Sequence, residues 1–176
     1  MSLRDQARIR KNKLEVWRQY LELGKAAYEL RQYNIGDKML KAAAQESASD
    51  EEMCRILAEI LESLADLLAK PDADRAERLY KRTMTIHDRV KSDATNASTC
   101  RVLYKLAELS VARNKHEVAL RYFGKALIIS RRSESLSPQL HLDLLRSLAS
   151  AWSQKGKHEE AMLVYNKSVQ ISEGLL

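Results

Sequence analysis

The sequence predicts an all-α protein built as a stack of four repeated helix pairs, and three observations lead to this prediction. The 176 residues contain only 5 glycines and 2 prolines, well below the ~7% and ~5% of an average protein. This is too few for the many tight turns of a β-sandwich or β-barrel, so these folds are disfavoured. A long segment repeats itself at a constant offset. Within each copy, the apolar residues recur at the 3.6-residue period of an amphipathic helix.

The repeat is clearest in the C-terminal half of the chain. Residues 102–130 align without a gap on residues 144–172, at an offset of 42 residues. Steps of 42 and then 41 residues back from Ala107 reach Ala65 and Gly24. We therefore expect a single array over 1–176, with residues 1–8 as an extension of the first helix and with units at roughly 9–50, 51–92, 93–134 and 135–176.

Each unit is expected to contain two amphipathic helices that cross at small residues. In the last unit, the first helix carries an apolar stripe from Leu142 to Trp152. A glycine or alanine at the crossing lets the helix axes approach to the short end of the usual ~8–10 Å range, and an aromatic ring can close over the gap. The residues expected to make this packing are Gly24, Gly36, Ala65, Ala76, Ala107, Ala119, Phe123, Ala149, Ala161 and Tyr165.

Short polar turns set the expected helix boundaries. The third helix would begin at Ser49 or Asp50 and the fourth at Asp72 or Asp74, because these side chains can cap a helix N-terminus. Pro71 lies in the turn of unit two, which is one residue shorter between its small residues than the other units. The expected helices are 5–31, 33–47, 51–69, 73–91, 96–113, 115–132, 138–154 and 157–173.

These residues resemble the tetratricopeptide repeat, whose pattern is a large residue, Leu-Gly, Tyr, and then Ala-x3-Phe. The corresponding residues are Tyr20, Leu23-Gly24, Ala27, Gly36 and Leu40 in unit one, Leu61, Leu64-Ala65, Leu68, Ala76 and Tyr80 in unit two, Leu103, Leu106-Ala107, Ser110, Ala119 and Phe123 in unit three, and Leu145, Leu148-Ala149, Trp152, Ala161 and Tyr165 in unit four. The resemblance implies a right-handed α-α superhelix. Its period of 41–42 residues and the lack of a terminal proline are similar to the long-helix repeats of kinesin light chains and the Pins adaptors.

The same resemblance implies a non-enzymatic scaffold or adaptor that binds a peptide or a partner helix in a concave groove lined by the first helices. The groove residues that it implies are Arg18, Lys25, Tyr28, Glu29, Glu59, Glu62, Asp66, Arg101, Tyr104, Glu108, Val111, Asp143, Arg146, Ser150 and Ser153. Recognition of chaperone C-termini is disfavoured, because Lys25 is the sole piece of that family's carboxylate-binding set.

The sequence contains no motif for catalysis, metal or cofactor binding. There is no GxxxxGK[ST], GxGxxG, GxSxG or HExxH. His116 and His158 occupy equivalent places before the second helix of their units, which favours a packing role over metal binding. Cys54 and Cys100 have no CxxC spacing and are expected to be free thiols. We therefore predict no enzyme, no catalytic residue, no metal and no cofactor.

Two alternative functions remain open. The last repeat lacks a polar capping helix, so the array could self-assemble into a homo-oligomer through Leu163, Val164, Ile171, Leu175 and Leu176. A basic N-terminal stretch with Arg4, Arg8, Arg10, Lys11 and Lys13 could bind nucleic acid or an anionic surface weakly. This second alternative is disfavoured, because Leu3, Ala7, Leu14 and Trp17 give the same helix an apolar packing face and the basic zones of the chain are interrupted by an acidic one.

Localisation and stability also follow from the composition. No apolar run approaches the ~18 residues of a membrane span, and no secretory signal is visible, so we expect no transmembrane segment and a cytoplasmic protein. Unit two is expected to be the weak part of the array, because its first helix carries Glu51, Glu52, Glu59, Glu62 and Asp66, whose like charges repel one another when uncompensated.

Overall fold

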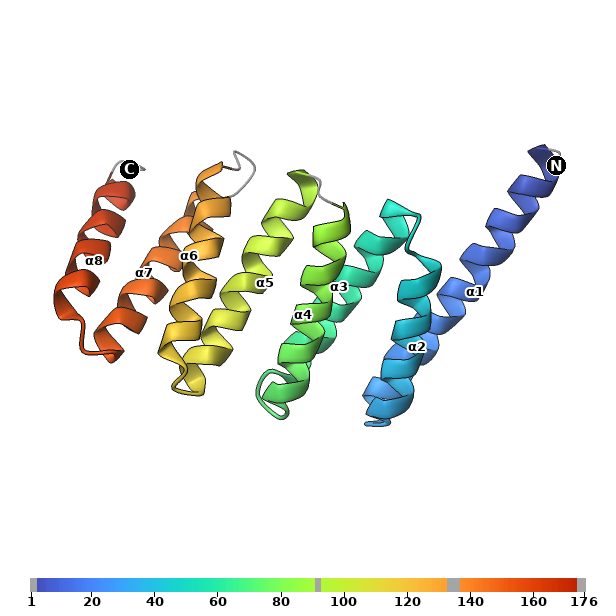
Figure 1. The fold of residues 1–176 in the computed structure, drawn as a ribbon, viewed down its shortest axis with the longest axis horizontal. Coiled ribbons are helices and arrows are strands. Elements are labelled where there is room, and N and C mark those ends of the chain that lie inside the picture. Colours follow the sequence, from blue (N-terminus) through green and yellow to red (C-terminus); the bar gives the residue numbers. More distant parts are fainter. Residues whose placement is uncertain (1–2, 91–92, 133–136, 174–176) are drawn as a thin grey trace.

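The computed structural model describes residues 3–90, 93–132 and 137–173, and over these ranges the chain forms eight α-helices and no strand. They pair in chain order, with the second helices α2, α4 and α6 in front of the first helices in the view of Figure 1. This confirms the predicted right-handed α-α superhelix of four helix pairs. The helices are α1 (Leu3–Glu29), α2 (Tyr33–Glu46), α3 (Glu51–Leu68), α4 (Ala73–Val90), α5 (Asp93–Ala112), α6 (His116–Arg132), α7 (Pro138–Gln154) and α8 (His158–Glu173).

Side-chain caps and left-handed residues set the ends of these helices. Asp50 accepts a hydrogen bond from the backbone N–H of Met53 (3.1 Å), and Asp72 accepts one from Arg75 (2.9 Å), so these two aspartates are the caps among the predicted alternatives. Arg31, Asn114 and Gly156 have positive φ in the turns that join the helices of units one, three and four. Within the described residues, the turn of unit two has no such position.

The helix crossings are as close as the small residues predict. A Cβ atom on Gly24 would lie 2.8 Å from the Cδ2 atom of Leu40, and one on Gly36 would lie 2.5 Å from the ring of Tyr28. The six alanines expected at the other crossings are all buried, and so is Phe123. Tyr165 is the exception, because no described segment covers the outer side of α8, and its side chain is 40% exposed.

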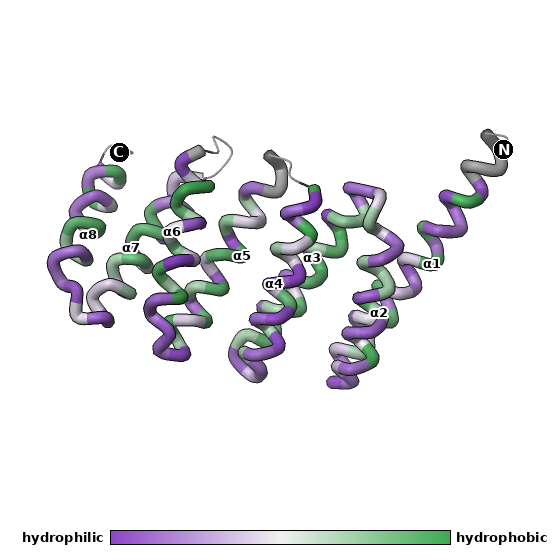
Figure 2. The backbone as a smooth tube through the Cα atoms, viewed as in Figure 1, coloured by the Kyte–Doolittle hydropathy of each residue, from purple (hydrophilic) through white to green (hydrophobic). Residues whose placement is uncertain are grey.

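The apolar residues form two buried clusters that interlock the units. The first cluster runs from Trp17 to Leu109 and the second from Cys100 to Ala151. Figure 2 shows hydrophobic and hydrophilic stretches alternating along the helices, as amphipathic helices require. No helix within the described ranges is long and apolar enough to span a membrane.

The three joints between consecutive units differ in tightness. α4 packs closely against α5, and α6 packs closely against α7. At the first joint, by contrast, α3 approaches α2 and α1 at only a few backbone positions. The first joint, between units one and two, is therefore the most open part of the array.

Four of the five acidic residues that the sequence predicts to weaken unit two have basic partners, so the repulsion expected among them is largely compensated. These ion pairs join Arg55 to Glu52 and Glu59 within α3, and they join Arg101 to Glu62 and Lys105 to Asp66 between α3 and α5. The sequence does not indicate this compensation, because Arg101 and Lys105 belong to the next unit and only the stacked structure brings them within reach.

Candidate functional site

An open cleft lies between α1 and α3 at the first joint, and we name it the first-joint cleft. Its volume is about 420 Å³. Its walls are mainly apolar and its rim carries charges of both signs. The lining residues are Lys25, Tyr28 and Glu29 of α1 and Ile56, Glu59, Ile60, Ser63, Leu64, Leu67 and Leu68 of α3.

Leu67 shows that this cleft exposes a surface that the other joints cover. Its side chain is 73% exposed, whereas Leu109, at the equivalent place 42 residues later, is 9% exposed. Ala151, another 42 residues on, is buried. The difference follows from the packing, because α3 meets the preceding unit at few positions while α5 and α7 are closely covered by α4 and α6.

A polar cluster closes the other side of the same joint. Asp37 of α2 accepts a hydrogen bond from the hydroxyl of Tyr28 (2.7 Å) and from the guanidinium groups of Arg82 (3.1 Å) and Arg75 (3.4 Å) of α4. The guanidinium of Arg75 also lies 4.3 Å from the ring centre of Tyr33. At the first joint, ion pairs and hydrogen bonds therefore connect the second helices α2 and α4, whereas the first helices α1 and α3 leave an open cleft between them.

Tyr28 connects the polar cluster to the cleft. Burial raises the pKa of its phenol, and the neighbouring carboxylate of Asp37 raises this pKa further. The phenol therefore stays neutral and donates to Asp37. Because the ring is also wedged against Gly36, Tyr28 gives the cleft a rigid wall.

A second, larger cleft adjoins the first and is called the N-terminal cleft here. It has a volume of about 680 Å³ and lies between the N-terminal half of α1 and the start of α3, with Ile56 lining both clefts. Arg10 and Lys13 cross it to Asp50 (3.6 Å) and Ser49 (3.3 Å). The two clefts together follow most of the α1–α3 joint.

Trp17 lies buried at the wall of the N-terminal cleft. Its indole Nε1 atom has no hydrogen-bond partner within the described part of the chain. The apolar packing face that the sequence predicts for α1 is confirmed at Trp17, while the side chains of Leu3 and Ala7 lie outside the described residues.

The predicted groove residues do not form one continuous free surface. Lys25, Tyr28, Glu29 and Glu59 line the first-joint cleft, and Arg18 lines the N-terminal cleft. Glu108, Val111 and Ser150 line a separate cavity of about 260 Å³ between α5 and α7.

The remaining predicted groove residues are mostly engaged within the chain. Glu62 and Asp66 form ion pairs with Arg101 and Lys105, and Asp66 also accepts a hydrogen bond from the hydroxyl of Tyr80. The hydroxyl of Tyr104 lies 3.2 Å from Oγ of Ser147, and Asp143 accepts a hydrogen bond from Gln139. Arg146 is exposed and Ser153 is half-buried, and neither lines one of these three cavities.

Sequence reasoning missed the apolar wall of the first-joint cleft. Ile56, Ile60 and Leu67 lie outside the stripe of Leu61, Leu64 and Leu68 that packs α3 into its own unit. The sequence signal for this wall is a second apolar stripe on α3 with spacings of four and seven residues. One apolar stripe is enough to pack a helix into its own pair, so a second stripe indicates a further contact surface. No group of three or more metal-ligating side chains lies together among the described residues.

No protein-family model matches the sequence, and no curated protein sequence matches it. Solved structures do resemble the fold. BtubC from P. vanneervenii superposes with a TM-score of 0.66 at 17% identity, over 89% of this chain and 63% of BtubC, so the chain spans less than two thirds of that protein's length. One structure of MamA superposes with a TM-score of 0.57 at 18% identity, over 99% of this chain and 96% of MamA, and another with a TM-score of 0.53 at 15% identity, over 90% and 93%. These similarities show a tetratricopeptide-like helical repeat fold.

Proposed function

We propose that this chain is a non-enzymatic interaction scaffold that binds a segment of another protein along the first-joint cleft. The observation that carries the proposal is the exposure of Leu67 in an apolar wall whose equivalents are buried at the later joints. Apolar surface that is left open and surrounded by polar groups is typical of a binding site. The tetratricopeptide-like fold supports the proposal, because solenoids of this kind present extended binding surfaces.

The shape of the cleft favours a short segment with apolar anchors. Its volume of about 420 Å³ lies at the lower end of the ~300–1,000 Å³ that ligand pockets span. It accommodates one or two apolar side chains, while the rest of the segment would lie across the rim formed by Lys25, Glu29 and Glu59. A helical or extended peptide with anchors three or four residues apart fits these dimensions.

The adjoining N-terminal cleft favours an acidic continuation of the ligand. Arg18 is exposed at its edge, and within the described residues no ion pair engages its guanidinium. Arg10 is largely exposed even though it contacts Asp50. A segment with an apolar anchor and neighbouring carboxylates would therefore satisfy both clefts.

A peptide selection tests this proposal directly. A random 16-residue library is selected on the purified chain, and the recovered peptides are measured against the Leu67→Asp variant, which places a charge in the apolar wall. We expect tenfold or greater loss of affinity. Leu163→Asp is the matched control, because Leu163 is equally exposed but lies on α8. Peptides that bind Leu67→Asp as well as the unchanged chain, or a selection that yields no ligand tighter than ~1 mM, would refute the cleft as the binding site.

Several finer statements from the sequence stay predictions. They are the grouping with kinesin light chains and Pins adaptors, the role as an adaptor, and the location in the cytoplasm. Weak binding of nucleic acid through the basic N-terminal helix is still disfavoured, because Arg10 and Lys13 contact the start of α3.

A further inference from the structure

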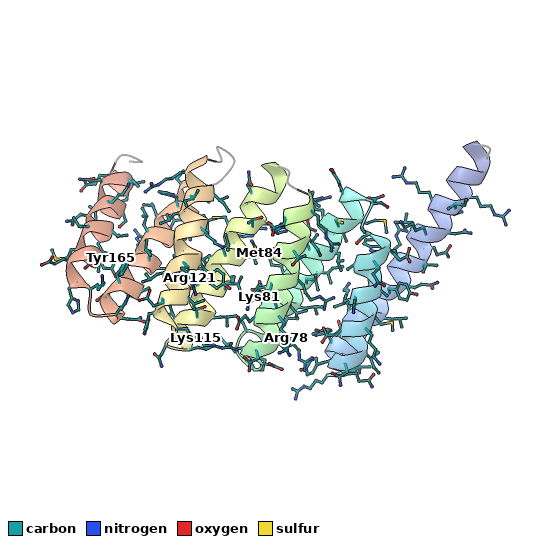
Figure 3. All side chains as sticks on the ribbon, in the orientation of Figure 1. Arg78, Lys81, Met84, Lys115, Arg121 and Tyr165 are labelled. Atoms are coloured by element: carbon teal, nitrogen blue, oxygen red, sulfur yellow. The ribbon has the colours of Figure 1, made fainter. Side chains whose placement is uncertain are left out.

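The outer face of α8 carries apolar residues that the equivalent helix buries. α6 and α8 align at the 42-residue offset, which matches Leu120 with Met162 and Phe123 with Tyr165. Leu120 is 9% exposed and Met162 is 64% exposed, while Phe123 is 1% exposed and Tyr165 is 40% exposed. Val169 is half exposed at the place where α6 has the buried Leu127. Figure 3 shows Tyr165 on α8, at the end of the array.

These residues have a defined structural role in α6. Leu120, Phe123 and Leu127 pack in one cluster with Leu144 and Leu145 of α7. The face is thus the side on which a second helix receives the first helix of the following unit. Within the described residues nothing covers the same face of α8.

The outer face of α1 is apolar in a complementary way. Val16 and Leu23 are exposed and seven residues apart, so they lie along one side of the helix, and Leu30, seven residues further on, is exposed directly after its last residue. Leu23 is 57% exposed, but Leu106, which holds the same place before the small residue of α5, is 2% exposed in the cluster that also contains Leu79 and Tyr80 of α4. This face of α1 therefore corresponds to the side of α5 that α4 covers.

We propose that the outer face of α8 in one copy of this chain packs against the outer face of α1 in a second copy, in the manner in which α6 packs against α7. The contact would join Met162, Tyr165 and Val169 to Val16, Leu23 and Leu30. Among the residues that the structure describes, each face lacks the partner that the repeat geometry provides at the inner joints, and each belongs to the type of helix that the other needs.

The charges of the two helices favour this pairing over α8 with α8. α1 carries seven lysines and arginines against four acidic residues, whereas α8 carries one lysine against three glutamates. Opposite net charge steers the two ends together, and like charge disfavours pairing of an end with itself.

The joints inside the chain supply a more specific electrostatic template. In each joint, a carboxylate near the start of a second helix forms an ion pair with a base of the next unit. The three pairs are Asp37 with Arg75, Glu77 with Arg113, and Glu117 with Lys155. In the last two pairs, the base lies in the turn that follows the next first helix. Glu159 of α8 is equivalent to Glu117 and is exposed, and Arg31 lies in the turn after α1, one residue beyond the place that Arg113 and Lys155 hold in their units. Glu159 of one copy is therefore placed to pair with Arg31 of the next.

A contact between two different faces leaves one face of each kind free in the dimer. After α8 of one copy has joined α1 of another, the dimer still exposes one α1 face and one α8 face. Such heterologous contacts extend into open chains or rings. Self-assembly of this chain should accordingly continue beyond the dimer as the concentration rises.

The test uses two variants that each block one end. Leu23→Asp places a charge on the α1 face and Met162→Asp places one on the α8 face, both at exposed positions where the monomer tolerates a polar side chain. Masses are measured by sedimentation over about 10 μM to 1 mM. We expect the unchanged chain to exceed the mass of a dimer with rising concentration. Each variant alone should stay at the monomer mass of 20.1 kDa, and an equimolar mixture should form a dimer and stop there, because it contains one intact face of each kind.

Other outcomes would overturn the proposal. An unchanged chain that stays monomeric at 1 mM shows that the two faces do not associate. If Leu23→Asp alone still forms a dimer, and adding Met162→Asp in equal amount does not increase the fraction of dimer, then α8 pairs with itself. Leu67→Asp is the control, since it lies outside both faces and should assemble normally, and circular dichroism of every variant excludes misfolding as the cause of a lost contact.

Discussion

Gly36 of α2 and Tyr28 of α1 meet so closely that a Cβ atom on Gly36 would lie 2.5 Å from the tyrosine ring. The hydroxyl of the same tyrosine donates to Asp37, the residue after the glycine. The crossing of the first helix pair, the polar cluster at the first joint and one wall of the first-joint cleft therefore depend on the position of one ring.

Substitution of Gly36 by alanine should destabilise the protein. The added methyl group must displace the ring of Tyr28, which is wedged between two helices, and overpacking of this kind costs about 1–3 kcal/mol. Gly124→Ala is the control, because a Cβ atom there meets nothing within 4 Å, and replacing a helical glycine by alanine stabilises by up to ~1 kcal/mol. Urea unfolding of both variants measures the difference. Equal stability of the two would show that the crossing is looser than described.

Removal of the Tyr28 hydroxyl should have a smaller effect. Tyr28→Phe keeps the ring in place but leaves Asp37 with only its two arginine partners, so we expect a loss of about 1 kcal/mol in the free energy of unfolding. Because the ring that lines the cleft is retained, affinity for a selected peptide should change less than twofold. A large loss of affinity with unchanged stability would instead indicate that the hydroxyl contacts the ligand.

Stability should fall on mild acidification because of His87. Its ring is buried, and its Nδ1 atom lies 3.0 Å from Oγ1 of Thr99. Burial lowers the pKa of His87, and the positive charge of Arg101 lowers it further, against the opposing effect of Glu62 and Asp88. The unfolded chain therefore binds a proton that the folded chain does not, and stability decreases as the pH falls below the ordinary histidine pKa of about 6.5.

The measurement for His87 is the pH dependence of urea unfolding between about pH 7.5 and 5, above the range where most carboxylates titrate. His87→Gln should reduce the slope of stability against pH over this window. A remaining slope is expected from His141, whose pKa burial also lowers. An unchanged slope in His87→Gln would show that this ring is protonated without penalty.

Unfolding should begin at the first joint. α3 approaches α1 and α2 at few positions, whereas the later joints are closely packed, and the stability of a solenoid is set by each pair and its neighbouring interface. Trp17 is buried in unit one and Trp152 is half-buried in unit four. In urea, the environment of Trp17 should change at lower denaturant than that of Trp152, and amide exchange should be fastest in α1 and α2 and slowest in α5 to α7. Coincident transitions and uniform exchange would show one cooperative body.

The parts of the fold that the sequence predicts well are those that depend on contacts within one unit. The small residues at 24, 36, 65 and 107 mark the crossings, since only glycine or alanine fits where two helices meet so closely. Asp50 and Asp72 mark the starts of α3 and α4, because a cap acts on the backbone only three residues away.

The parts that could not be predicted depend on how one unit sits on the next. Arg101 and Glu62 are 39 residues apart and pair only in the stacked array, so both were expected to be free for a ligand. Leu67 and Leu109 occupy equivalent places in the sequence, and only the spacing of the joints decides that one is open and the other covered. Tyr165 matches the family pattern as well as Phe123 does, yet no helix within the described residues covers it as α7 covers Phe123.

The first-joint cleft as the binding site is tested most directly by mapping a bound peptide with methyl NMR. Isoleucine and leucine methyl groups are labelled, and a peptide selected on the unchanged chain is titrated in. We predict that the largest shift changes occur at Ile56, Ile60 and Leu67, which line the cleft, and that the methyl groups of Leu163 and Ile171 on α8 stay unchanged. Shift changes centred on α8, or at the cavity beside Val111 between α5 and α7, with none at Ile60 and Leu67, would contradict the assignment of the first-joint cleft as the binding site.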